Sequence, residues 1–187
     1  MKPWSLLESA KWLARTGWMM RGVPASIAET VSQHSWEAGI IAFVIASRAK
    51  AACSDVDPHK AAALGLVHDL LEGFLGDIPR YTSLSMGDLK NSIERKALKE
   101  LGLEASIERL LEEWMEGVSV ESRIARVADS IATYLQALRY MGTGYRRTAE
   151  IAETSRRKAV ELSSGTCFET VVLEIVNEVD KAFRTEV

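Results

Sequence analysis

The chain has 187 residues, 47% of them hydrophobic and 26% charged, which is typical of one globular domain with a single core. Its formal net charge of −3 argues against binding to a nucleic acid polymer. No stretch is apolar and long enough to span a bilayer, and the N-terminus lacks a signal peptide's apolar region, so we expect a cytoplasmic protein without membrane contact. Cys53 and Cys167 follow no metal-type spacing, so neither a disulfide framework nor a zinc finger is expected.

The predicted elements are helices almost throughout, because no run of alternating apolar and polar residues suggests a strand. Asp57 and Pro58 form a typical helix start, with an N-cap carboxylate and a proline at the first helical position. Between residues 73 and 87, glycines and a proline predict an irregular segment. The sequence therefore predicts an all-α fold, a helical bundle in one domain over residues 1–187. In chain order, the expected helices cover residues 5–14, 30–52, 58–71, 88–101, 105–114, 120–140, 146–163 and 169–184.

Four side chains depart from the apolar pattern of these helices. His34 lies near the start of the second expected helix, His68 and Asp69 near the end of the third, and Asp129 inside an apolar run. Two imidazoles and two carboxylates suit a divalent ion such as Mn²⁺, Fe²⁺, Co²⁺ or Ni²⁺, with Zn²⁺ as a further option. Each residue alone is more often structural, as a hydrogen-bonded histidine or an ion-paired aspartate. His59, on a polar first turn, is expected to have no function.

A longer pattern surrounds these four residues. The segments "RTGW" (15–18), "ETVSQHS" (29–35), "HDLLEGFLGDIP" (68–79) and "VADSIATYL" (127–135) occur in this order over about residues 13–140. Together they resemble the HD-domain metal-dependent phosphohydrolases, in particular the subgroup that includes bacterial 5′-deoxynucleotidases and related archaeal proteins. The C-terminal helices, at residues 146–184, contribute little to this resemblance.

The resemblance implies an HD-type fold and assigns roles to particular residues. It implies catalytic roles for Glu72 and Asp77, and Gln33 stands where the family commonly has glutamate. It associates an arginine with the phosphate, and both Arg15 and Arg21 are candidates. The implied metal ligands are His34, His68, Asp69 and Asp129, and the implied substrate-binding residues are Arg15, Trp18, Asp77, Ile78, Pro79 and Arg80.

The chemistry expected from these residues is hydrolysis of a phosphomonoester. Glu72 follows His68 by four residues, so on one continuous helix it would share that ligand's face and act on the attacking water. Asp77 would protonate or position the leaving oxygen, and Arg15 would bind phosphate oxygens bidentately. The structural alternatives are a solvated helix-end carboxylate for Glu72 and core packing for Trp18. With three histidines in the chain, one of them set aside, a single metal ion is favoured.

The expected function is a metal-dependent 5′-nucleotidase that prefers deoxyribonucleoside 5′-monophosphates. The alternatives are an HD phosphohydrolase for another phosphate ester or a nucleoside triphosphate, and a non-catalytic helical interaction module stabilised by a metal. No clear basic run favours a triphosphate, because the arginines and lysine at positions 146–147 and 156–158 are interpreted as solvated helix faces. A homodimer is expected, because the C-terminal helices offer apolar faces for a contact between copies, although these faces could equally be core. Those faces carry Val171, Val172, Ile175 and Val179.

Overall fold

The computed structural model describes residues 3–184, and the all-α prediction is confirmed over this range. It contains no β-strand there, apart from an isolated bridge between Ala14 and Thr30. No helix in the described range is long and apolar enough to cross a membrane. The elements are α1 (Pro3–Trp12), α2 (Thr16–Met19), α3 (Val31–Ala49), α4 (Pro58–Val67), α5 (Glu72–Leu75), α6 (Arg80–Met86), α7 (Asp88–Leu101), α8 (Ala105–Glu116), α9 (Val120–Gly142), the 3₁₀ turn η1 (Arg146–Thr148), α10 (Ala149–Ser163) and α11 (Glu169–Arg184).

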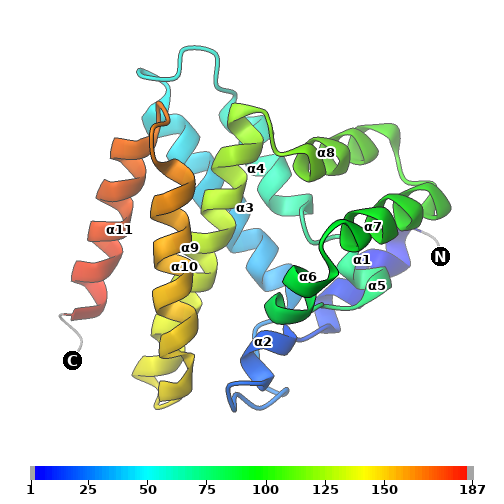
Figure 1. Ribbon diagram of the computed structural model, residues 1–187, viewed down its shortest axis with the longest axis horizontal. Helices are drawn as coiled ribbons and strands as arrows, with labels where there is room; N and C mark the ends of the chain where they lie inside the picture. The colour runs from blue at the N-terminus through cyan, green and yellow to red at the C-terminus, as the bar shows by residue number, and fades with distance from the viewer. Residues whose placement is uncertain (1–2, 185–187) are drawn as a thin grey trace.

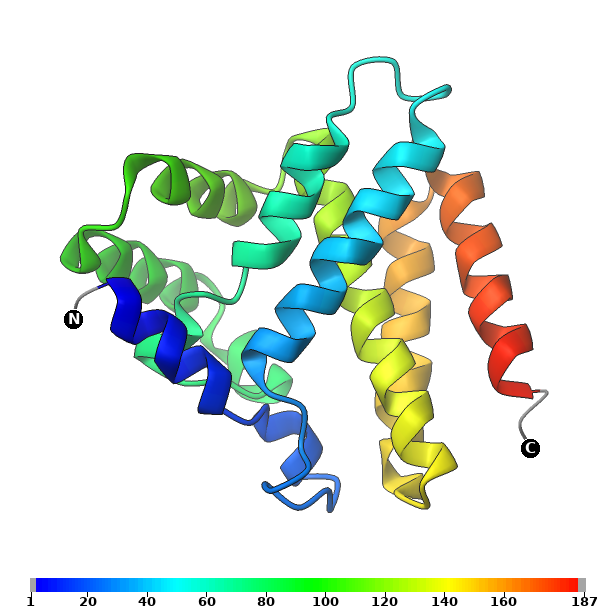
Figure 2. The same ribbon diagram turned by 180° about the vertical axis from the view of Figure 1, so that it is seen from behind.

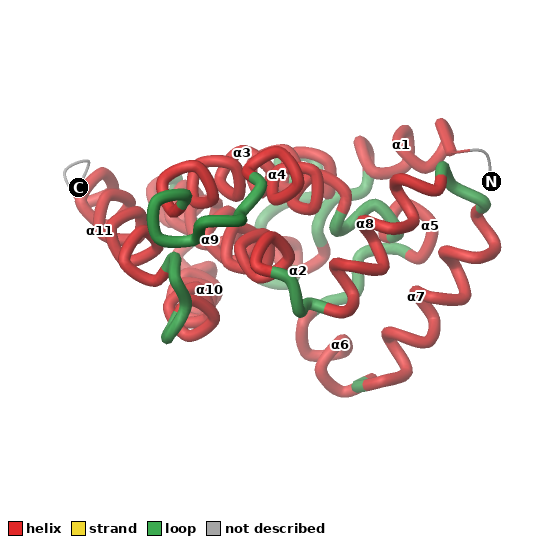
Figure 3. Tube along the Cα trace, turned by 90° about the horizontal axis from the view of Figure 1, so that it is seen from above, coloured by secondary structure: helices red, strands yellow, loops and turns green. Residues whose placement is uncertain are grey.

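Three helices, α3, α4 and α9, form the centre of the molecule (Figure 1). Helices α10 and α11 pack on one side of this centre, and α1 with α5 to α8 lie on the other, as the view from behind also shows (Figure 2). Seen from above, α6, α7 and α8 extend away from α11 (Figure 3). The largest apolar core lies between α3, α4, α9, α10 and α11, and a smaller one joins α1 to α7 and α8. Helices α3, α4 and α9 are therefore packed against other helices on both sides.

Local signals explain where the central helices begin. Thr30 caps α3 in a capping box, in which its hydroxyl accepts from the Gln33 N–H and the Gln33 amide oxygen accepts from the Thr30 N–H. The Asp57 carboxylate caps α4 with Pro58 at the first helical position, as predicted.

The largest departures from the predicted helix boundaries lie between residues 67 and 87. Helix α4 ends at Val67 and does not continue to residue 71 as predicted. The chain turns there and forms α5, and the segment expected to be irregular contains both α5 and α6. Glycines separate these short helices, and Gly76 has a φ of 85° that a residue with a Cβ rarely adopts. One short helix, α2, was not expected at all.

Helices α3 and α4 approach each other closely at two glycines. A Cβ built on Gly65 would lie 2.8 Å from the Gly39 Cα and 2.9 Å from the Ala38 carbonyl oxygen. These neighbours are backbone atoms, so they cannot move aside without moving the helix. The pair of glycines therefore sets how close the two helices are, and with them the two histidines that they position.

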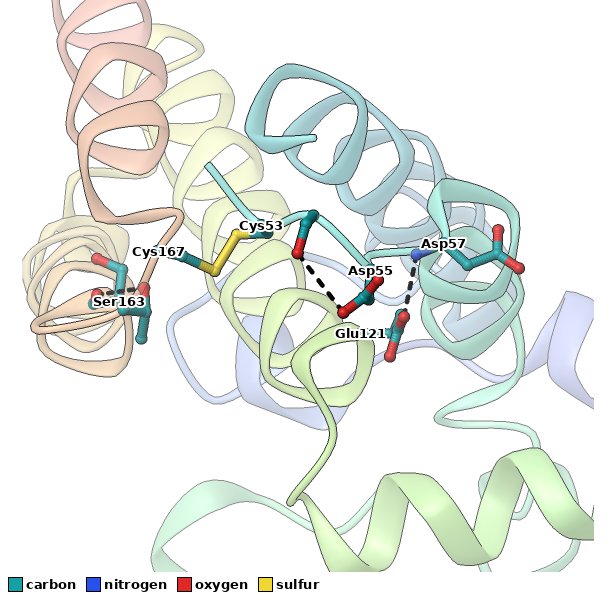
Figure 4. Close-up of a disulfide and its surroundings, with 8 residues drawn as sticks. Cys53, Asp55, Asp57, Glu121, Ser163 and Cys167 are labelled. Carbon is teal, nitrogen blue, oxygen red and sulfur yellow. Dashed lines mark hydrogen bonds between the residues drawn. A yellow bond between two sulfur atoms is a disulfide. The ribbon is translucent and has the colours of Figure 1, made fainter. Parts of the chain in front are cut away.

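The sequence spacing of the two cysteines argued against a disulfide framework, and this expectation has to be corrected because the structure holds one disulfide. Cys53 and Cys167 form a disulfide, with their Cα atoms 5.5 Å apart (Figure 4). Cys53 follows α3 and Cys167 precedes α11, and these two helix ends meet at the same end of the bundle. A separation of 114 residues in the chain hides this neighbourhood. Beside the disulfide, the Glu121 carboxylate accepts a hydrogen bond from the Asp57 N–H (Figure 4).

The four valine and isoleucine residues of α11 named above pack against the core, so they give no support to a dimer. Val172 is fully buried and Ile175 is nearly so, and both pack in the main cluster with residues of α3 and α9. Val171 and Val179 are half-buried against the same core or its neighbour. The alternative interpretation from the sequence, that these residues belong to the core, is therefore correct.

Candidate metal centre

The four predicted ligands meet at one place between the central helices. His34 comes from α3 and Asp129 from α9, and the His34 Nε2 lies 3.1 Å from the Asp129 Oδ1. His68 and Asp69 come from the turn after α4, and the Asp69 Oδ2 lies 3.0 Å from the His68 Nε2 and 3.7 Å from the His34 Nε2. Ligand atoms of His34, His68 and Asp129 all lie within 4.8 Å of one another. The geometry is that of a group which can surround one cation.

The chemistry of the two imidazoles fits a metal. The His68 Nδ1 donates to the Gly65 carbonyl oxygen at 2.8 Å, which leaves the lone pair on Nε2. Within the described part of the chain, that Nε2 is buried and makes no hydrogen bond of acceptable geometry, although Asp69 is close. The His34 Nδ1 lies 3.1 Å from the Arg15 Nη1, which can only donate, so the His34 Nε2 holds a proton toward Asp129. A cation between these groups would replace that proton and satisfy the orphaned nitrogen.

The carboxylates of the cluster are held in their charged form. Burial alone would raise the pKa of Asp69, but His68, then His34 and Arg15, lower this pKa to about 2. Burial likewise opposes the ionisation of Asp129, and Lys158 together with His34 holds its pKa well below the ordinary value. The pKa of His68 is raised despite its burial, because Asp69 faces it. Each of these shifts reflects a site whose two carboxylates stay negative and attract positive charge.

Arg15 joins the cluster to a buried polar frame. Its Nη1 donates to the Glu29 carboxylate at 3.2 Å and approaches the Thr133 hydroxyl at 3.4 Å. The indole N–H of Trp18 also donates to Glu29, and the Trp18 ring packs edge-on against Tyr140. Glu29 thus holds the guanidinium by an ion pair, while the guanidinium also faces the cluster. Trp18 is 2% exposed, so it offers the cavity little more than one edge.

Glu72 and Asp77 lie beside the cluster, but not for the reason expected. The chain bends after α4, so Glu72 begins α5 and is not on the helix that precedes His68. A turn brings Glu72 near the cluster, and its N–H donates to the Asp69 carbonyl oxygen. Burial, with Asp69 and Asp77 nearby, raises the pKa of Glu72 to about 10. Its Oε2 is buried without a hydrogen-bond partner among the described residues. The Asp77 carboxylate accepts from the Thr16 N–H and ties its loop to α2.

A cavity of about 510 Å³ opens onto the cluster. Such a volume is in the range of small-molecule sites. Among the described residues, five basic side chains and five acidic side chains line it. The basic ones are Arg15, Arg80, Lys90, Arg126 and Lys158, and the acidic ones are Asp69, Glu72, Asp77, Glu94 and Asp129. Trp18, Ile78 and Pro79, predicted as substrate-binding residues, also line this cavity.

Sequence reasoning missed residues of the cavity that come from outside the motifs. Lys158, expected on a solvated helix face, is partly exposed but also lines the cavity, with its Nζ 3.4 Å from the Asp129 Oδ2. Trp114 of α8 packs against the His68 ring at 4.8 Å and against the Arg126 guanidinium. A signal for Lys158 was present, since Ile151, Ser155, Lys158 and Leu162 share one face of the expected helix.

Three residues discussed from the sequence lie away from the cluster. Arg21 pairs with Glu150 at 2.8 Å and does not line the cavity, so Arg15 is the arginine beside the ligands. His59 donates its backbone N–H to the Asp57 cap and packs against Phe43. Gln33 makes the α3 capping box, so its neutral amide acts at the helix start and not at the ligands.

Comparisons with known proteins agree with this geometry. A family model described as "HD domain" matches residues 7–168. The 5′-deoxynucleotidase HDDC2 of Danio rerio is 28% identical over 141 residues, which cover 72% of this chain and 66% of that protein. The 5′-deoxynucleotidase YGK1 of Saccharomyces cerevisiae is 23% identical over 146 residues, covering 73% of this chain and 64% of that protein. The chain thus matches slightly less than two thirds of the length of these curated relatives.

Two solved structures resemble the whole chain. The PH0347 protein of Pyrococcus horikoshii OT3 is 27% identical with a TM-score of 0.78, over 96% of this chain and 97% of that chain. A conserved hypothetical protein of Pyrococcus furiosus has the same identity and TM-score, over 94% and 96%. The likeness therefore extends to the C-terminal helices, which the sequence motifs do not cover.

Proposed function

The chain belongs to the HD-domain family, and from this membership and the geometry of the cluster we propose that it is a metal-dependent phosphohydrolase. Its proposed reaction is hydrolysis of nucleoside 5′-monophosphates, deoxyribonucleotides preferred, to nucleoside and phosphate. The observation that supports this best is the orphaned Nε2 of His68 in a ring of two histidines and two carboxylates, at the wall of a substrate-sized cavity. The names of the two curated relatives favour the nucleotide.

His34, His68, Asp69 and Asp129 are the proposed ligands of one divalent ion. Two imidazoles and two carboxylates suit manganese, cobalt, nickel, iron or zinc better than magnesium. Such an ion, when bound, polarises the phosphoryl group and lowers the pKa of a water molecule. The described residues near the cluster include no third histidine, because His59 packs elsewhere, and this favours a single ion.

Glu72 is the proposed acid–base group of the reaction. Its carboxyl is buried beside Asp69 and has an oxygen without a partner among the described residues, so it is available to a water molecule in the cavity. Added positive charge in the cluster favours its ionised form, which can accept a proton from the attacking water. Arg15 is the proposed phosphate ligand, since a guanidinium has five donors and its contacts with Glu29, His34 and Thr133 all use one nitrogen. Asp77 would hold or protonate the leaving 5′-oxygen, with Ile78, Pro79 and Arg80 beside it.

The charge of the cavity favours a monoester over a triphosphate. Its five basic and five acidic side chains balance formally, so a bound divalent ion would leave two positive charges. That excess matches a phosphomonoester dianion. A triphosphate, with about twice that charge, would leave the cavity strongly negative.

The test is phosphate release from a panel of nucleoside mono- and triphosphates and non-nucleotide esters, with and without Mn²⁺ or Co²⁺. We expect metal-dependent turnover of 5′-monophosphates, with the deoxy forms fastest. Glu72→Gln should keep its metal while kcat falls by roughly 10²–10⁴. No turnover of any ester by metal-loaded protein would contradict the proposal and favour a metal-stabilised interaction module. Turnover of triphosphates alone would favour the other phosphohydrolase.

We also propose that the protein is a cytoplasmic homodimer. Nucleoside monophosphates are intracellular, which accounts for the location. For the dimer, Trp36, Ile40 and Phe43 lie at helical spacing on α3 and are 63%, 51% and 39% exposed. A contiguous apolar face of this kind suits an isologous contact with a second copy of the chain. Sedimentation equilibrium of wild type and Trp36→Lys tests it: a monomeric wild type would contradict the dimer, and a dimeric variant would contradict this surface.

A further inference from the structure

Helix α10 supplies one wall of the cavity. Five residues of this helix line it, and their spacing places them on a single face: Ile151, Thr154, Ser155, Lys158 and Leu162. Helix α10 packs along α9, which bears Asp129 (Figure 1). Four of the five side chains are neutral, so Lys158 is the charged group that this wall presents to a ligand.

Lys158 contacts the oxygen of Asp129, a proposed metal ligand, that does not face His34. The Asp129 Oδ1 faces the His34 Nε2, whereas its Oδ2 faces the Lys158 Nζ at 3.4 Å. An ammonium has three N–H donors, and Asp129 takes one. The side chain is 44% exposed, and because it lines the cavity, its other donors are open to a ligand there. An ion pair this exposed adds little to folding stability, so packing alone gives weak reason for a lysine at this point.

Arg15 also lines the cavity and contacts α9 close to Asp129. Arg15 contacts Thr133, which lies one helical turn after Asp129. Asp129 with Lys158 and Thr133 with Arg15 are therefore successive steps on one face of α9. A phosphate beside the proposed metal ligands would therefore have both basic groups within the same cavity.

We propose that Lys158 binds the substrate phosphate together with Arg15, donating to a non-bridging oxygen while it retains Asp129. This assignment rests on the proposed phosphohydrolase function. It adds a residue from the C-terminal helices to a site that the sequence motifs place within residues 13–140. It also gives α10 a part in substrate affinity.

The experiment measures binding of inorganic phosphate to Mn²⁺-loaded protein by calorimetry, without any turnover. Lys158→Met should weaken phosphate binding roughly tenfold or more, the usual scale for a lost charge-assisted hydrogen bond. Lys158→Arg should recover most of the affinity, because it keeps the charge. The matched control is Arg157→Met on the same helix, whose side chain is 58% exposed and pairs with Glu161. Its phosphate affinity should equal that of wild type.

The outcomes separate this proposal from the function on which it rests. If Lys158→Met binds phosphate as tightly as wild type, Lys158 is not a phosphate ligand. The same conclusion follows if the variant binds Mn²⁺ more weakly but has normal phosphate affinity at saturating Mn²⁺. The assignment also fails if wild type binds no phosphate, or if Arg157→Met is equally weakened. If wild type binds phosphate through Lys158 but hydrolyses no ester, the assignment stands and the proposed function fails.

Discussion

Replacing Gly65 by alanine tests whether the contact between α3 and α4 sets the geometry of the metal centre. The added Cβ would meet backbone atoms of Ala38 and Gly39 at 2.8–2.9 Å, closer than carbon and oxygen tolerate. Because neither backbone can yield alone, α4 must shift away from α3. His68 lies three residues further along, and its Nδ1 donates to the Gly65 carbonyl oxygen, so the shift moves this proposed ligand away from His34.

Two opposing terms set the magnitude of the effect. Alanine is favoured over glycine inside a helix by about 1 kcal/mol. Overpacking a close contact costs about 1–3 kcal/mol, and backbone neighbours place this site toward the upper end. We therefore expect Gly65→Ala to lower the free energy of unfolding by about 1–2 kcal/mol, or Tm by roughly 2–8 °C for a chain of this size. Metal affinity should fall roughly tenfold, the lower end for a disturbed ligand support.

Urea unfolding and Mn²⁺ titration of the same preparation measure both effects. The control is Gly142→Ala near the end of α9, where an added Cβ meets no atom within 4 Å. This control should be as stable as wild type or slightly more so, with unchanged metal affinity. If Gly65→Ala matches the control in both measurements, the glycine contact does not determine the separation of the two histidines, and the reasoning is refuted.

Three further predictions concern ligands, pH and the disulfide. Asp129→Ala should lose its metal by elemental analysis, whereas His59→Ala should keep it; metal loss in His59→Ala would overturn the ligand assignment. In the folded, metal-free protein, burial raises the pKa of Glu72 from 4.5 to about 10, so this carboxyl keeps its proton at neutral pH. The free energy of unfolding of wild type, measured with urea, should therefore fall as pH rises from 6 toward 9. The same free energy should fall less in Glu72→Gln. Parallel pH curves would contradict the raised pKa. Replacing both cysteines by alanine should lower the free energy of unfolding by up to about 4–5 kcal/mol, and a reductant should not change the stability of this variant. Equal stability of wild type in reductant and in oxidant would exclude the disulfide.

Much of the fold was predictable from local signals, and the sequence also singled out the side chains that gather in the candidate metal centre. The Asp57-Pro58 start of α4 was correct because capping depends on neighbouring residues. His34, His68, Asp69 and Asp129 were singled out because they interrupt apolar helices and because the surrounding segments resemble HD-domain proteins. The structure brings their side chains together. The resemblance to HD-domain proteins is confirmed by the family match over residues 7–168.

The features that sequence reasoning missed depend on contacts between distant segments. The helical spacing puts Lys158 on a face with apolar residues, but that this face meets Asp129 is decided only by the packing of α10 against α9. The Cys53–Cys167 pair and the bend after Val67 have the same origin, since tertiary packing decides which helix ends meet and where a helix stops. Glu72 was correctly associated with the cluster, but a turn, and not a continuous helix face, brings it there.

The Cys53–Cys167 link also determines how the molecule responds to a protease. The outlying helices α6 and α7 carry highly exposed residues, with Tyr81 at 82% and Leu84 at 70%, and lie inside the loop that the disulfide closes. A single cut there would separate Asp69 from Asp129 along the backbone, yet leave both pieces joined through sulfur. The nicked protein should run as one species on a non-reducing gel and as two after reduction. All four proposed metal ligands would stay in one covalent molecule until the reductant is added.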